Sequence, residues 1–122
     1  MHQISCGEGR FQVTVSAIKT DEGIAVIITG GSKSHVGAVV LSSPRPSLTG
    51  EGASCDSWII PLPGHKDDII AKELAETLCR QLQVPVSVTA GVHIDNADNN
   101  ELKLLCKNCL NAGEQLLSLL SQ

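Results

Sequence analysis

Two kinds of apolar periodicity follow one another along the chain, and their order limits the possible folds more than any other feature. Residues 10–19 alternate, with Phe11, Val13 and Val15 on one face of an extended chain and polar residues on the other, which is typical of a half-buried strand. Shorter apolar runs of strand length follow at 24–29, 36–41 and 57–62. The first half of the chain therefore predicts four strands. A hairpin joins the first two, and residues 42–54, rich in Pro, Ser and Gly, form a mobile loop.

Helical spacing dominates the second half. Apolar residues recur at every fourth position over residues 66–83, which predicts an amphipathic helix. Residues 86–92 alternate again and predict a fifth strand. Asp98 and Glu101 then have the spacing of a capping box, so a second helix begins there and runs to about Leu120.

The predicted order of elements is ββββαβα. Because the strands mostly precede the helices, the pattern favours an α+β fold with an antiparallel-rich sheet of about five strands and two helices packed on one face. With 122 residues, of which 42% are hydrophobic, the chain has the length of one domain, residues 1–122, and two domains would each be too small to bury a good core.

Composition excludes several classes of function. The net charge is −4 and the nine Lys and Arg residues are scattered, whereas a nucleic-acid binder needs a basic surface. Phe11 and Trp58 are the only aromatic residues apart from histidine, too few for a base-stacking platform. The longest apolar run, Ile24–Ile28, is too short to cross a membrane. An odd number of cysteines, five, and no signal-peptide pattern at the start favour a cytoplasmic, reduced protein.

Three histidines fall beside glycines at the boundaries of predicted elements. His35 lies between Gly31 and Gly37, His65 follows Gly64, and His93 follows Gly91, as the printed sequence shows. Glycine permits a positive φ or a close approach of the backbone to a ligand. Three such coincidences favour one shared binding site over three unrelated turns.

Each segment has a functional and a structural interpretation. The segment from Gly31 to Gly37 is either a cradle of backbone N–H groups with Lys33 as the counter-charge or a polar turn. It lacks the spacing of a P-loop.

The other two segments are equally open. Gly64, His65 and Lys66 stand at a predicted helix N-terminus, where an anion is favoured, although a plain Pro-Gly turn accounts for them as well. His93 and Asp95 are two residues apart, so in an extended chain the carboxylate can orient the imidazole; alternatively both are ordinary edge and turn residues.

Two enzymatic interpretations compete with the interpretation of these residues as a binding site. His35, His65, His93 and Asp95 have the side-chain types of a zinc site, but neither a HExxH motif nor paired CxxC motifs accompany them, and we assign no metal ligand or catalytic residue. Cys106 and Cys109 form a single C-x-x-C inside a predicted helix, not at the helix N-terminus where a redox motif belongs, which favours small apolar core residues.

The ordered set of these segments resembles a known family. Gly31-x-x-x-His35-Val36-Gly37-Ala38-Val39, Pro63-Gly64-His65-Lys66-Asp67 and Gly91-Val92-His93-Ile94-Asp95-Asn96-Ala97, with Asn111 further on, resemble the LpdD-like prenylated-flavin chaperone domain over nearly the whole chain. The family also looks similar in fold to proteasome assembly chaperones.

The resemblance implies a non-catalytic accessory protein. It would bind prenylated FMN, or a related flavin phosphate, and support or mature a UbiD-type aromatic acid decarboxylase. The residues expected to hold the cofactor are Gly31, Lys33, His35, Gly37, Gly64, His65, Lys66, His93 and Asp95. The alternatives are a small metal-assisted enzyme using the histidines and Asp95, and an assembly chaperone without a small ligand.

The second helix also predicts a partner. Its expected buried stripe consists of Leu102, Leu105, Cys109, Ala112, Leu116 and Leu120. Four further leucines lie partly off that stripe: Leu104, Leu110, Leu117 and Leu119. A second apolar face on a small protein often binds another chain, and a symmetric homodimer is the commonest result.

Overall fold

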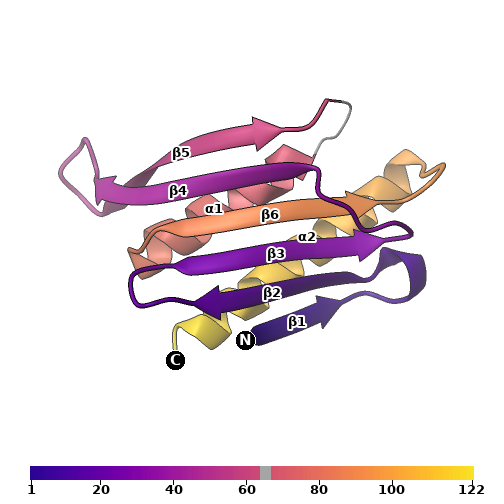
Figure 1. Cartoon of the computed structure of the whole chain (residues 1–122), viewed down its shortest axis with the longest axis horizontal. Coiled ribbons are helices and arrows are strands. Elements are labelled where there is room, and N and C mark those ends of the chain that lie inside the picture. Colours follow the sequence, from indigo (N-terminus) through magenta and orange to yellow (C-terminus); the bar gives the residue numbers. More distant parts are fainter. Residues whose placement is uncertain (64–66) are drawn as a thin grey trace.

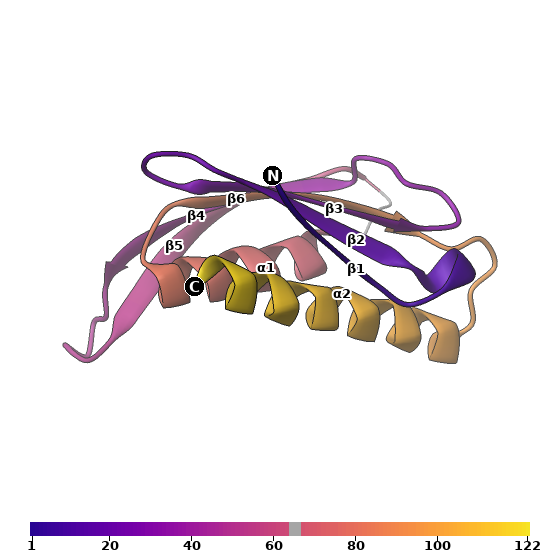
Figure 2. The same ribbon diagram turned by 90° about the horizontal axis from the view of Figure 1, so that it is seen from below.

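The computed structural model describes residues 1–63 and 67–122, and in them six strands form one sheet with two helices on the same face (Figures 1 and 2). The strands are β1 (His2–Cys6), β2 (Val13–Lys19), β3 (Ile24–Gly31), β4 (Ala38–Pro46), β5 (Ala53–Pro61) and β6 (Val86–His93). The helices are α1 (Asp67–Leu82) and α2 (Asn99–Leu120), and a short 3-10 turn covers Gly9–Phe11. The predicted α+β class and the placement of both helices on one face are confirmed.

The strand order is β1-β2-β3-β6-β4-β5. Every neighbouring pair is antiparallel except β3 and β6, which run parallel. The predicted hairpin is the β2–β3 pair. Since β6 is inserted between β3 and β4, the chain leaving β3 must cross the end of β6 before β4 can begin.

The sheet has one strand more than predicted, and two of its strands are longer. β1 pairs with β2 at the edge of the sheet. The loop predicted over residues 42–54 is too long: only residues 47–52 connect the strands, because β4 continues to Pro46 and β5 begins at Ala53. Beyond Ser42, β4 pairs with β5 alone, so Pro44 and Pro46 have one unpaired side, where a missing N–H group breaks no ladder hydrogen bond.

The core lies between the sheet and the two helices. The inward side chains of β2, β3 and β6 are mostly valine and isoleucine, and they pack against the buried faces of the helices. α1 covers β4, β5 and β6, while α2 covers β1 and β2. Gly113 of α2 faces Leu74 of α1, and a side chain there would press on that leucine, so the glycine sets how closely the helices approach.

The predicted stripe of α2 is correct except at its first residue. Leu105, Cys109, Ala112, Leu116 and Leu120 are buried, whereas Leu102 is exposed. The stripe also contains a polar residue, Asn108, whose Nδ2 donates a hydrogen bond of 2.8 Å to the Phe11 carbonyl. The predicted capping box is confirmed: Asp98 accepts from the Glu101 N–H, and Glu101 accepts from the Asp98 N–H.

The two cysteines of the C-x-x-C have different environments. Cys109 is buried, and this burial raises the pKa of its thiol to about 12, with smaller contributions from Cys106 and Asp67. Cys109 is therefore a neutral core residue, as predicted. The same interpretation is wrong for Cys106, which is exposed on α2.

Candidate functional site

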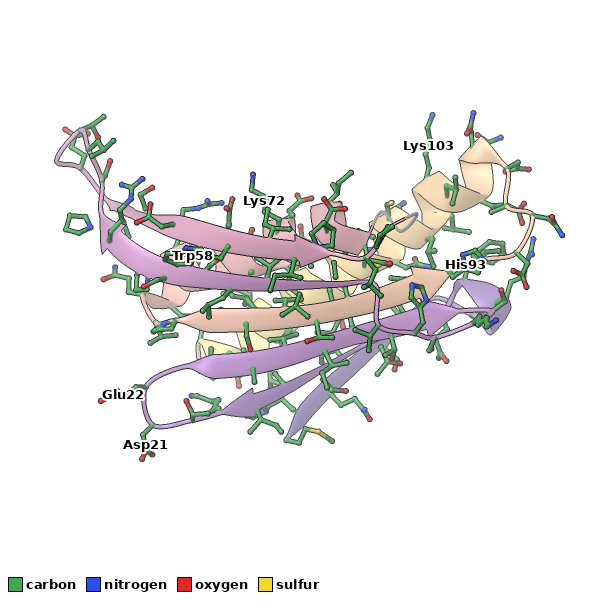
Figure 3. All side chains as sticks on the ribbon, turned by 45° about the horizontal axis from the view of Figure 1, so that its top comes forward. Asp21, Glu22, Trp58, Lys72, His93 and Lys103 are labelled. Carbon is green, nitrogen blue, oxygen red and sulfur yellow. The ribbon has the colours of Figure 1, made fainter. Side chains whose placement is uncertain are left out.

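The crossover from β3 to β4, residues 32–37, is tied by its backbone to the end of β6. The N–H groups of Ser32 and Lys33 donate to the His93 carbonyl at 2.8 and 3.3 Å. The N–H of His35 donates to the Gly91 carbonyl at 3.4 Å, and that of Gly37 donates to the Ala90 carbonyl at 2.8 Å. This crossover lies at the opposite end of the sheet from the β2–β3 turn that carries Asp21 and Glu22 (Figure 3).

These bonds correct one interpretation of the glycine segment. A backbone cradle needs several free N–H groups converging on an anion, but four of those between Gly31 and Gly37 are already donated to β6 carbonyls, and the N–H of Gly31 donates to Gln12. At this segment the exposed side chain of Lys33 is the cationic group that can contact a ligand anion.

The glycines at the crossover are required by the packing of the protein on itself. A Cβ at Gly91 would overlap the carbonyl of His35, and a Cβ at Gly37 would overlap the carboxylate of Asp67. Gly31 has a φ of +81° and would meet the His93 backbone. The absence of side chains at these positions lets the crossover lie directly on β6, which brings His35 into the site.

Asp67 holds His35 in place. It is the first residue of α1 and is 5% exposed. One carboxylate oxygen accepts the Val92 N–H at 2.9 Å, and the other lies 3.0 Å from Nε2 of His35. The other ring nitrogen of His35 faces the Lys33 carbonyl at 3.4 Å. A carboxylate at a helix N-terminus is also favoured by the helix dipole, so α1, β6 and the crossover meet at this one group.

His93 has its own carboxylate partner, which is one of the two interpretations that the sequence left open. Its Nε2 lies 2.9 Å from Oδ1 of Asp95, and both side chains are exposed. The rings of His35 and His93 are 6.2 Å apart, edge to face. Two imidazoles, each oriented by an aspartate, therefore stand side by side at the end of β6, where Figure 3 shows His93.

A cavity of about 480 Å³ opens beside this pair of imidazoles, between α1, the end of β6 and the beginning of α2. Its walls are mostly aliphatic, with Asp67 and His93 as the ionisable groups among the lining residues. The apolar and sulfur-containing lining residues are Ile69, Ile70, Val92, Ile94, Ala97, Leu102, Leu105 and Cys106. Its volume falls in the range of small-molecule sites, and apolar walls with a few polar groups are their usual character.

A second, shallower groove follows the outer side of α2. It shares Leu102 and Cys106 with the cavity and is also lined by Lys103 and Lys107. The cavity therefore continues into a surface that carries two positive charges, one helical turn apart.

The structure brings together Gly31, Lys33, His35, Gly37, His93 and Asp95, the predicted site residues of the crossover and of the β6 end. The predicted site residues Gly64, His65 and Lys66 lie outside the described residues. The zinc alternative finds no support in residues 1–63 and 67–122, where no group of three potential ligands converges.

Asp67 is the site residue that sequence reasoning missed, because an acid in the first turn of a helix is explained by the helix dipole alone. The signal that would have found it is its position on the apolar stripe. Asp67 is in helical register with Ala71, Leu74 and Leu78, all of which are buried. An acid on the buried face of an amphipathic helix needs a partner.

Together, the sheet, the two helices and the cavity define a small α+β domain with a ligand-sized cavity at one end of the sheet. The chain belongs to the prenylated flavin chaperone LpdD-like domain family, whose model matches residues 7–121. No curated protein matches the chain in sequence.

A solved structure confirms the relationship in fold. A chain of the structure described as a novel chaperone complex for yeast 20S proteasome assembly superposes with a TM-score of 0.58, covering 98% of this chain and 94% of that chain. The two are 20% identical, so the likeness concerns the fold alone. In the described part of the chain, neither helix has the length and apolar character needed to cross a membrane.

Proposed function

We propose that this protein binds prenylated FMN, or a related flavin phosphate, in the cavity beside His93, and that it supports a UbiD-type aromatic acid decarboxylase without being an enzyme itself. It would act in the cytoplasm as a homodimer. The observation that carries the proposal is the ligand-sized apolar cavity lined by His93, which Asp95 orients, and by Asp67, which holds the neighbouring His35. Membership of the flavin chaperone family supports the choice of ligand.

The cavity suits the apolar part of such a ligand. An isoalloxazine with a prenyl-derived ring is broad and mostly apolar, and Ile70, Leu102 and Leu105 offer aliphatic surface to it. Burying apolar ligand area stabilises the complex by roughly 25 cal/mol per Å². The scarcity of aromatic residues is therefore compatible with binding through aliphatic contact.

The polar groups around the cavity suit the rest of the ligand. With Nε2 of His93 directed at Asp95, the carboxylate fixes which ring nitrogen donates to it and leaves the other for a ligand. Lys33 on the crossover and Lys103 on α2 are exposed cations on two sides of the site. Either lysine side chain could form a salt bridge with the phosphate of the ligand.

A carrier must also release its cargo. The oriented imidazoles form hydrogen bonds that can exchange with water, and the buried thiols are poor nucleophiles. Burial, with a smaller contribution from the neighbouring Cys55, raises the pKa of Cys79 to about 11. Burial also raises the pKa of Cys109, to about 12. Both remain neutral thiols at physiological pH.

The proposal is tested by titrating the protein with FMN and with prenylated FMN, followed by calorimetry. We expect binding to the wild type, at least tenfold weaker binding to His93→Ala, and unchanged binding to the control His2→Ala on β1. Leu102→Trp, which fills the cavity, should also weaken binding, whereas the control Leu104→Trp on the same helix should not. No binding of either flavin to the wild type would refute the proposal.

An assembly chaperone without a small ligand is the second candidate. It is favoured by the apolar side chains exposed on the sheet face that the helices leave open, such as Trp58 and Ile60. Co-purification with a decarboxylase subunit distinguishes the two functions. If the complex forms equally well with His35→Ala and His93→Ala, and no flavin binds, this second function is the correct one.

A further inference from the structure

The thiols of Cys55 and Cys79 meet where β5 packs on α1, away from the cavity. β5 is an edge strand of the sheet (Figure 1), and α1 lies against it. Cys55 pairs with Pro44 of β4, in the part of the sheet beyond Ser42 that β6 does not reach. The cavity opens at the other end of β6, so this pair of thiols is separate from the proposed flavin site.

The two thiols interact with each other. Burial is the main cause of the raised pKa of Cys79, and the charge of Cys55 and a side-chain hydrogen bond between the two thiols add to it. Cys55 is half-buried against the core, and Cys79 is fully buried in it. For Cys106 and Cys109, one exposed and one buried on α2, no such hydrogen bond contributes to the pKa of Cys109. Within the described residues, Cys55 and Cys79 are therefore the thiols best placed to form a bond.

A polar network holds Cys55 in this position. Nη1 of Arg80 donates to Sγ of Cys55 at 3.8 Å and lies 3.7 Å from Oε1 of Glu76. The other carboxylate oxygen of Glu76 accepts from the hydroxyl of Ser57 at 2.7 Å, and the hydroxyl of Ser42 lies 2.7 Å from that of Ser57. Side chains of β4, β5 and α1 are thus tied together beside the two thiols, which are held next to each other before any bond forms.

The two thiols differ in accessibility, and this difference assigns their roles. A small reagent can reach Cys55, which is half-buried beside the exposed Arg80, whereas Cys79 is fully buried. Because burial raises the pKa of Cys79 to about 11 and the thiolate is the attacking species, Cys79 does not react first. Once Cys55 is part of a disulfide, its charge and its hydrogen bond no longer raise the pKa of Cys79, while Arg80 still lowers it. Cys79 is therefore suited to the second step.

We propose that Cys55 and Cys79 are a dithiol site for low-molecular-weight disulfides, and that their oxidation fastens β5 to α1 through an intramolecular disulfide. In the first step the Cys55 thiolate attacks glutathione disulfide, bonds to one glutathione sulfur and expels the other glutathione as a thiolate. In the second step Cys79 gives its proton to solvent and attacks the Cys55 sulfur, which expels the remaining glutathione. The two cysteines lose two electrons in total, and these electrons reduce the glutathione disulfide to two thiols.

The new bond would act on a weakly held part of the sheet. β5 pairs with β4 alone, and an edge strand that opens offers unpaired backbone groups to other chains. Fastening β5 to α1 would limit this local opening. Disulfides of cytosolic proteins are usually transient and respond to redox conditions, so the dithiol is the resting state in the proposed compartment. The inference does not depend on flavin binding.

The test incubates the folded, flavin-free protein with glutathione disulfide, alkylates the remaining thiols and maps the peptides without reduction. We expect a peptide pair linked through Cys55 and Cys79, which dithiothreitol separates. Cys55→Ser should lose this linkage, and Cys79→Ala should stop at a glutathione bound to Cys55. The matched control Cys106→Ser, which removes an exposed thiol on α2, should keep the linkage. Circular dichroism checks that each variant folds, and Cys55→Ser decides the outcome if Cys79→Ala does not.

Thermal unfolding and hydrogen exchange give independent readouts. The oxidised wild type should melt about 5–15 °C above the reduced protein, and the amide hydrogens at the start of β5 should exchange roughly tenfold more slowly. Oxidant should change neither quantity in Cys55→Ser. Three results would overturn the proposal: a linkage between Cys106 and Cys109 in place of the expected one, a wild type that stops at glutathione on Cys55, or an oxidised protein that melts no higher than the reduced one.

Discussion

Replacing the buried carboxylate of Asp67 tests whether this residue organises the site. In Asp67→Ala, the N–H of Val92, which is itself buried, loses its acceptor, and an unsatisfied buried donor costs about 1–3 kcal/mol. The negative charge at the N-terminus of α1 is also lost, which costs about 0.3–1 kcal/mol. We expect the free energy of unfolding to fall by about 1.3–4 kcal/mol, the sum of the two contributions.

Asp68→Ala is the matched control, because Asp68 carries the same charge in the same turn of α1. Asp68→Ala should lower the free energy of unfolding only by the helix-dipole contribution, about 0.3–1 kcal/mol. Urea unfolding followed by circular dichroism gives both values, provided that the free energy of unfolding falls with urea concentration at the same slope in each protein. If Asp67→Ala costs no more than Asp68→Ala, the carboxylate is not the anchor between α1, β6 and the crossover, and the reasoning fails.

Three further predictions concern the crossover and the thiols. Gly91→Ala should lower the free energy of unfolding by more than about 3 kcal/mol and abolish flavin binding, because the new Cβ overlaps the His35 carbonyl. An unfolding curve like that of the wild type would contradict this prediction. Cys106 lines the cavity, so bound flavin should slow its alkylation several-fold in a peptide-mapping experiment, and equal rates would place the ligand elsewhere. Burial raises the pKa of the Cys109 thiol to about 12, from an ordinary value of 9.0. The free energy of unfolding should therefore fall as the pH rises above about 9, and it should fall less steeply in Cys109→Ala. Identical slopes of unfolding free energy against pH in the two proteins would exclude Cys109 as the cause.

The regular parts of the fold were predictable because their periodicity reports burial directly. β2, β3, β6 and both helices were predicted within a few residues. The hairpin of β4 and β5 was not predicted, because Pro44 and Pro46 are typical of a loop. Both prolines fit a strand only because β6 pairs with β4 no further than Ser42, and the sequence does not reveal this. Edge positions are decided by strand order, which is a long-range property and leaves no local signal in the sequence.

The candidate site was predictable in part, for a related reason. Glycine beside histidine marked the crossover and the end of β6, and these segments do converge. The reason for the glycines differs from the expected one, since Gly37 and Gly91 make room for the protein's own Asp67 and His35. The partnership of His35 with Asp67, 32 residues apart, depends on where α1 begins relative to β6, and only the three-dimensional structure reveals it.

The parallel pairing of β3 with β6 is what creates the site. Parallel strands end at the same edge, so Gly31 and His93 are register partners. Because β4 lies on the far side of β6, the chain must cross the end of β6, and the crossover carries His35 to a ring separation of 6.2 Å from His93. An all-antiparallel sheet of consecutive hairpins would need no such crossing and would leave the two histidines on separate turns. The imidazole pair and the cavity beside it therefore follow from one topological choice, the insertion of β6 between β3 and β4.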